Sequence, residues 1–224
     1  MLYTAHYALS AEGENKKMSE KIYLHPVTER VWHWIHAILV ILLILSGAQI
    51  HWPDSFNLFG SYSNAISLHN WAGILLVCDF FLWLLYNLIS RRMSHYIVRK
   101  EDIHPGMVVQ ARFYAYDIFK NRPHPYSPSE NNKFNPLQKA TYFNFMFFMM
   151  PLLLISGVLY MYPSYFSSFI SFLGGLKVVA VFHYIMAIIF AAFFIAHIYL
   201  ATTGHTIFAD FISMITGYAE KEEH

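Results

Sequence analysis

Four long apolar segments constrain this chain more than any other feature. They cover about residues 31–52, 66–89, 140–162 and 178–201, and Asp79 is the one Asp, Glu, Lys or Arg residue inside them. Each segment is near the ~20 residues that a helix needs to cross a ~30 Å hydrocarbon layer. The segments are apolar on all sides, whereas the helices of a soluble bundle would have polar outer faces. We therefore expect an all-α integral membrane protein, a four-helix bundle that runs up-down-up-down.

The distribution of basic residues predicts how the bundle is oriented. Of the 15 Lys and Arg residues, all but Lys177 lie before the first segment, between the second and third, or after the fourth. The positive-inside rule then puts both termini and the long connection on the cytoplasmic side of the membrane. We expect this membrane to be a bacterial inner membrane. Residues 1–20 lack the apolar core of a signal peptide, so we expect the first span to be retained, and the start could be Met1 or Met18.

The chain divides into a cytoplasmic N-terminal segment (1–29), one four-span domain (30–218) and a short tail (219–224). Within the long connection, GMVVQARFYAYDIFK (106–120) predicts a short amphipathic helix on the membrane surface, which could be a simple anchor or could help quinone access. The one cysteine, Cys78, excludes a disulfide framework and a cysteine-ligated iron–sulfur cluster. A net charge of +1 without a basic patch gives no sign of a nucleic-acid partner.

Histidines in the spans are the strongest functional signal, because polar side chains in hydrocarbon are costly and tend to be functional. His183 and His197 are fourteen residues apart. Fourteen residues make nearly four helical turns, so both histidines share one face and lie ~21 Å apart along the axis. With the predicted orientation, His183 is near the outer surface and His197 near the inner one. His69 matches the depth of His183, and either His33 or His36 matches His197.

Two imidazoles at the same depth, on neighbouring helices, can hold a flat haem between them. Four neutral imidazoles without nearby Cys, Asp or Glu suit a structural zinc site poorly. Small residues one turn beyond the outer histidines, Gly73 and Ala187, would leave room for a porphyrin. The set predicts two b-type haems and an electron path across the bilayer. Two alternatives remain: histidines that only bond to neighbouring helices, and a histidine-lined metal transporter that binds no haem.

A weak internal repeat links the first and third spans. LLILSGAQIHWP (42–53) is echoed by LLLISGVLYMYP (152–163), and in each a glycine, Gly47 or Gly157, precedes a proline by six residues. The two spans could simply end alike. Alternatively, the glycines let a flat ligand or a neighbouring helix approach the backbone closely.

Three motifs together resemble the b-type cytochrome subunits of membrane-bound nickel–iron hydrogenases, formate dehydrogenase and thiosulfate reductase, a four-span di-haem family. They are RVWHW (30–34), SLHNWAG (67–73) and the H-x13-H of the fourth span. The resemblance covers residues 29–217 and implies that His33, rather than His36, pairs with His197. It also makes Arg30 a candidate partner for a haem propionate, although Arg30 could equally be a positive-inside anchor.

KFNPLQK (133–139) resembles the segment that helps to bind menaquinone in the formate dehydrogenase subunit. The resemblance implies that Asn135 and Gln138 contact a quinone, since amides can hydrogen-bond a quinone oxygen. The family has a small residue where Leu137 stands here, which puts a backbone contact at that point in doubt. The alternative for both amides is a polar cap on a helix start. His205, beyond the fourth span, is expected to be interfacial and not a ligand.

The resemblance implies a membrane-anchoring di-haem subunit that transfers electrons between a periplasmic iron–sulfur or multihaem subunit, with its catalytic subunit, and the quinone pool. The substrate chemistry would then belong to that other subunit. The alternative is a stand-alone, quinone-linked cytochrome b that acts on a small molecule such as superoxide. The sequence predicts neither the direction of electron flow nor the quinone type.

Overall fold

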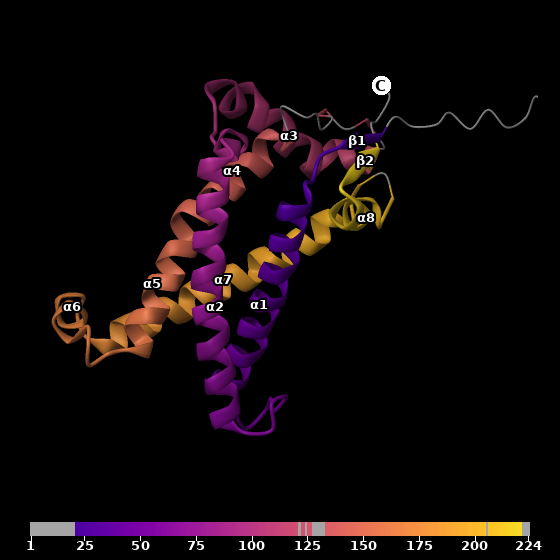
Figure 1. The fold of residues 1–224 in the computed structure, drawn as a ribbon. Coiled ribbons are helices and arrows are strands. Elements are labelled where there is room, and N and C mark those ends of the chain that lie inside the picture. Colours follow the sequence, from indigo (N-terminus) through magenta and orange to yellow (C-terminus); the bar gives the residue numbers. More distant parts are fainter. Residues whose placement is uncertain (1–20, 121, 124, 127–132, 205, 221–224) are drawn as a thin grey trace, which may run out of the picture.

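Four apolar helices long enough to cross a membrane dominate the computed structural model, which describes residues 21–120, 122–123, 125–126, 133–204 and 206–220 (Figure 1). They are α1 (Val27–His51), α2 (Tyr62–Ile89), a third span over Pro136–Met161, and α7 (Leu176–Ala201). The prediction of an all-α four-span protein is confirmed. The predictions for residues 1–20, His205 and the end of the tail concern positions outside the described residues.

Each span begins two to four residues before the apolar run that predicted it, because polar residues form the first turn. At the start of α2, the Ser61 side chain accepts a hydrogen bond from the Asn64 backbone N–H, as an N-cap does. The third span consists of α4 (Pro136–Asn144), a π-helical turn (Phe145–Met149) and α5 (Met150–Met161). The π-helical turn comes just before Pro151, which has no N–H to donate to a preceding carbonyl.

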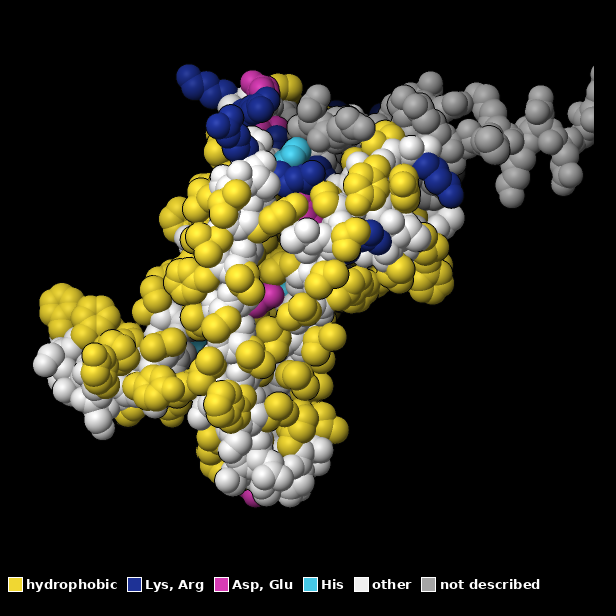
Figure 2. Space-filling model, in the orientation of Figure 1, with side chains coloured by type: hydrophobic (Ala, Val, Ile, Leu, Met, Phe, Trp, Pro, Cys, Tyr) yellow, Lys and Arg dark blue, Asp and Glu magenta, His cyan; other side chains and the backbone are white. Residues whose placement is uncertain are grey.

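The spans form two helical hairpins, α1 with α2 and the third span with α7, and α2 packs against α5 between them. A continuous apolar core joins the hairpins through side chains such as Leu76, Trp83, Met150 and Phe190. On the face drawn in Figure 2, hydrophobic side chains cover the shafts of the helices, and Lys and Arg gather toward the end with α3 and α8. This is the pattern that a lipid environment requires.

The end that we predict to be cytoplasmic holds the shorter elements. After η1 (Arg92–His95), the long connection forms an irregular helix through η2 (Asp102–Met107), α3 (Val108–Arg112), η3 (Phe113–Asp117) and η4 (Ile118–Lys120). Beyond α7, α8 (Ala209–Thr216) leads into β2 (Tyr218–Glu220), which pairs antiparallel with β1 (Lys21–Tyr23). At the opposite end, α6 (Ser167–Phe172) precedes α7 and lies at the lower left of Figure 1.

The stretch 106–120, predicted to be a short amphipathic helix, is helical, and its location on a membrane surface stays a prediction. Asp102, Gly106, Gln110 and Phe113 are buried, whereas Val108 and nearby apolar side chains are exposed. The buried face is partly polar because Lys139, at the start of the third span, donates to both carboxylate oxygens of Asp102 at 3.0 Å. An ion pair therefore holds this helix against the bundle.

A second group of charges joins the ends of α1 and α2 at the same side. Glu29 pairs with Arg92 at 2.8 Å and also accepts a hydrogen bond from Lys133, just before α4. Burial lowers the pKa of Lys133, and the nearby Glu29 carboxylate opposes that shift. The two ion-pair groups thus fix the long connection to α1 and to the third span.

Candidate functional site

The outer pair of histidines comes from the second and fourth spans, as predicted. His69 on α2 and His183 on α7 have ring centroids 6.3 Å apart, with their planes at 82°. The Nδ1 atom of each ring is bonded to a serine of a different helix: His69 to Ser46 on α1 at 3.0 Å, and His183 to Ser156 on α5 at 2.9 Å. Four side chains from four helical segments therefore build this site.

The serines define which ring nitrogen can bind a ligand. A serine hydroxyl has one hydrogen to donate, and Ser46 donates it to the Leu42 carbonyl at 2.6 Å while Ser156 donates to the Leu153 carbonyl at 2.9 Å. Each serine oxygen is therefore an acceptor toward its histidine, and Nδ1 of each ring is the donor. Nε2 is left as the free lone-pair nitrogen on both rings, which is the nitrogen that a metal would take.

Two glycines leave room for each outer histidine ring to lie close to the neighbouring helix of its own hairpin. A Cβ on Gly47 would lie 3.4 Å from Cε1 of His69, and a Cβ on Gly157 would lie 3.2 Å from Cε1 of His183. The internal repeat of the sequence thus has a shared structural role, because each Ser-Gly pair receives the ring of one outer histidine. The sequence argument noted the two glycines but missed the serines beside them.

The inner pair joins the first and fourth spans. His33 on α1 and His197 on α7 also have ring centroids 6.3 Å apart, at 57°. Aromatic rings surround them: Phe193 stacks on His197 with centroids 6.1 Å apart, and Tyr142 of the third span meets it edge-on at 6.3 Å. Nδ1 of His33 is buried and has no hydrogen-bond partner within the part of the chain that the structure describes.

The spacing of both pairs can be tested against a haem iron with one imidazole on each side. Metal–imidazole bonds of ~2.0–2.1 Å, with each ring centroid ~1.1 Å behind its nitrogen, require centroids roughly 6.2–6.4 Å apart. Both observed separations, 6.3 Å, fall in that range. The separation in each pair is therefore compatible with one bis-histidine haem.

His36, the sequence alternative to His33, is engaged elsewhere. Its Nδ1 lies 2.8 Å from Oδ2 of Asp79 on α2, and the side chains are 15% and 7% exposed. Trp32 packs on the His36 ring with centroids 4.9 Å apart and donates its indole N–H to the Asp79 carbonyl at 3.3 Å. The lone carboxylate of the apolar segments thus joins α1 to α2 beside the inner histidines.

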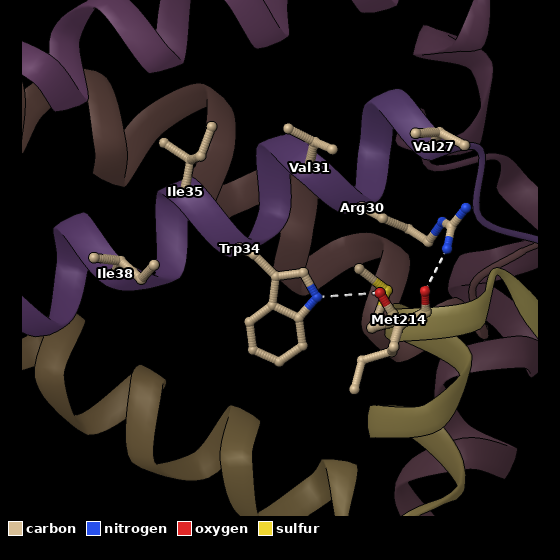
Figure 3. A pocket seen from close by; sticks show the side chains of 8 residues that line it. Val27, Arg30, Val31, Trp34, Ile35, Ile38 and Met214 are labelled. Carbon is tan, nitrogen blue, oxygen red and sulfur yellow. Dashed lines mark hydrogen bonds between the residues drawn. The ribbon is translucent and has the colours of Figure 1, made fainter.

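Arg30 and the inner end of α1 face α8. The Arg30 guanidinium donates to the Ile215 carbonyl, and Trp34 donates its indole N–H to the Met214 carbonyl at 3.1 Å (Figure 3). These residues line an apolar groove of about 530 Å³ between the two helices. The carbonyls belong to the last turn of α8, where a cation is stabilised by the helix dipole.

Buried donors gather near His33. Besides His33 Nδ1, Arg30 Nε and His25 Nδ1 are buried and lack a partner among the described residues. Burial lowers the pKa of His25 to about 3, and the charges of Lys133, His33 and Arg30 add to that effect. Unpaired buried nitrogens are costly, and a haem propionate would satisfy Arg30 Nε, which is the role predicted for Arg30.

Asn135 and Gln138 form a capping box at the start of α4. Asn135 Oδ1 accepts from the Gln138 backbone N–H at 2.9 Å, and Gln138 Oε1 accepts from the Asn135 N–H at 3.2 Å. Asn135 Nδ2 donates to the Tyr114 hydroxyl at 3.3 Å. The alternative cap role is therefore present in the structure, and the quinone contact stays a prediction.

Comparisons with known proteins agree with this architecture. The chain is 34% identical to cytochrome YdhU of Escherichia coli over 95% of its own length and 81% of that protein. It is 26% identical to a protein of Azospira oryzae named as the protein-methionine-sulfoxide reductase subunit YedZ1, over 90% of this chain and all of that one.

A formate dehydrogenase cytochrome b556 subunit of Haemophilus influenzae is also 26% identical, over 81% of this chain and 71% of that protein. The family model of prokaryotic cytochrome b561 matches residues 24–217, which contain all four spans and all four candidate ligands. The chain therefore belongs to the prokaryotic cytochrome b561 family and is a b-type membrane cytochrome that transfers electrons.

Proposed function

We propose that this protein is a di-haem membrane subunit that carries electrons across the bilayer between an outer redox partner and the quinone pool. The observation that carries the proposal is the presence of two histidine pairs with the same centroid separation, 6.3 Å, near opposite ends of α7. One pair alone would hold a haem near one face of the membrane only. Two pairs on one helix provide a route between its faces.

In this proposal His69 and His183 hold an outer haem, and His33 and His197 hold an inner one. Each bound haem would supply a one-electron redox centre. Arg30 would pair with a propionate of the inner haem, where its buried Nε lacks a partner among the described residues. The aromatic rings beside His197 would keep the inner site apolar and exclude water.

The outer partner is proposed to be an iron–sulfur or multihaem subunit that serves a catalytic subunit. The names of two relatives, a formate dehydrogenase subunit and a methionine-sulfoxide reductase subunit, support an assembly of this kind. Under the positive-inside rule, the distribution of basic residues favours a periplasmic position for the outer histidines, where such a partner would bind. A quinone, with menaquinone implied by the family resemblance, would exchange electrons at the inner haem.

The quinone contact is proposed at the amide nitrogens of Asn135 and Gln138. Their oxygens are used by the capping box, whereas a quinone oxygen needs a donor. Replacing Asn135 by Asp would keep the capping oxygen and remove the donor. We expect Asn135→Asp to lower quinone-dependent turnover with both haems bound. Unchanged turnover would leave Asn135 with the capping role alone.

Haem content tests the proposal most directly. The pyridine haemochrome assay on the purified full-length protein should give two b haems per chain, and fewer would contradict the di-haem model. His197→Ala should remove the inner haem and keep the outer one, while His36→Ala should keep both. Co-purification tests the partner, because a chain isolated alone that acts on a soluble small substrate would favour the stand-alone alternative.

A further inference from the structure

The two candidate haem sites differ in what surrounds their histidines. Both outer rings donate Nδ1–H to a serine oxygen, at 3.0 Å for Ser46 and 2.9 Å for Ser156. At the inner site, Nδ1 of His33 has no such partner among the described residues. The hydrogen bond is therefore a property of the outer site and not a general feature of the spans.

Each serine is itself held in place. Ser46 is fully buried and Ser156 is 3% exposed, and each hydroxyl donates to a carbonyl of the preceding helical turn. The hydroxyl hydrogen is thus committed, and the oxygen can only accept. This arrangement fixes the tautomer of the histidine, with the proton on Nδ1 and the lone pair on Nε2.

A hydrogen bond donated by the far nitrogen of an imidazole makes the metal-bound nitrogen more basic. A more basic ligand favours ferric over ferrous iron and lowers the reduction potential. At the outer site both axial ligands have this bond, so the two effects add on one iron.

We propose that Ser46 and Ser156 are a matched pair of positioning residues that orient both outer ligands and lower the potential of the outer haem. The inference rests on the proposed di-haem function. Neither serine touches the haem in this account, because each acts through the histidine to which it is bonded. Gly47 and Gly157 complete each unit by leaving space for the ring edge.

The test is a spectroelectrochemical titration of the purified full-length protein with both haems bound. His197→Ala, which should keep the outer haem alone, assigns the outer midpoint. We expect Ser46→Ala and Ser156→Ala each to raise that midpoint and the double variant to raise it further, with the inner midpoint unchanged. Loss of one such bond should also weaken outer haem binding by roughly 10–100-fold.

Ser90 offers a matched control, since its hydroxyl donates to the Tyr86 carbonyl at 2.6 Å, four residues back, as Ser46 does to Leu42. Ser90→Ala should leave both midpoints unchanged. If an alanine variant loses the outer haem, the corresponding Ser→Thr variant decides. Recovery of the haem at the original midpoint would support the proposal, whereas a threonine variant that behaves like alanine would overturn it.

An unchanged outer midpoint in a double alanine variant that keeps both haems would also overturn the proposal. Fewer than two haems in the unaltered protein would instead contradict the di-haem function itself. The two failures are therefore distinguishable.

Discussion

Removing the carboxylate of Asp79 is the perturbation whose effect the structure defines best. The His36–Asp79 contact is 2.8 Å long and both side chains are largely buried, at 15% and 7% exposure. If both groups are charged, an effective dielectric constant of 20 gives a gross attraction of about 6 kcal/mol at this distance. Desolvation of the two groups offsets several kcal/mol of that attraction, so the pair itself contributes little net stability.

Removing one partner of the His36–Asp79 pair is expected to destabilise the protein more than replacing both partners. Asp79→Leu leaves His36 in an apolar setting without its acceptor, at a cost of about 1–3 kcal/mol. The double variant His36→Leu/Asp79→Leu replaces both polar groups by apolar ones and should recover most of that loss. Because Asp79 lies on α2 and His36 on α1, we expect the loss of stability to come from weaker packing between these two helices.

The measurement is the midpoint of thermal unfolding in detergent, followed by the haem absorbance, for the two single variants and the double variant. The cycle should give a coupling energy of at least about 1.5 kcal/mol, as expected for a hydrogen bond that involves a charged group. Additive single effects would refute the reasoning. Loss of the inner haem from His36→Leu but not from His33→Leu would mean instead that His36 is the inner ligand.

Two further predictions concern single contacts. Gly157→Ala should lower outer haem content more than Gly47→Ala, because the added Cβ would lie 3.2 Å from His183 Cε1 against 3.4 Å at the other ring; equal content in both variants would contradict this. Lys139→Met should cost about 3–5 kcal/mol by leaving the Asp102 carboxylate buried without its cation. Adding Asp102→Asn should restore much of that stability in the same unfolding assay, and no recovery would show that the Lys139 side chain matters by packing alone.

The sequence predicted the spans and the histidine pairings because it gives each residue of a span a depth in the membrane. Hydrocarbon thickness sets span length, and basic residues set orientation, so every position in a span acquires a depth. Depth alone paired His69 with His183, and the structure has these rings together. Depth could not separate His33 from His36, since one helical turn moves a residue only ~5 Å. The family resemblance favoured His33, and the structure pairs that residue with His197.

Contacts that depend on helix rotation were beyond the sequence argument. Ser46 and His69 are 23 residues apart and Ser156 and His183 are 27 apart, so no local spacing rule links them. The bond between His36 and Asp79 was missed for the same reason. The β1–β2 pairing joins residues near the two ends of the chain, and each strand is three residues long, too short for an alternating pattern to reveal it.

The internal repeat of the first and third spans contributes to the outer histidine site but not to the inner one. At the outer end, each hairpin supplies the same unit: a Ser-Gly pair on one helix and a histidine on the next. At the inner end the repeat breaks, because His197 faces His33 from the first span, and the third span presents Tyr142 to it instead of a histidine.

The outer site gives both of its histidines the same hydrogen bond, whereas the inner site has different neighbours on its two sides. In the proposed di-haem arrangement, a change at Ser46 or Ser156 would therefore alter the potential of the outer haem and leave that of the inner haem unchanged. The potential difference between the two haems would then be set by residues outside the proposed ligand pairs.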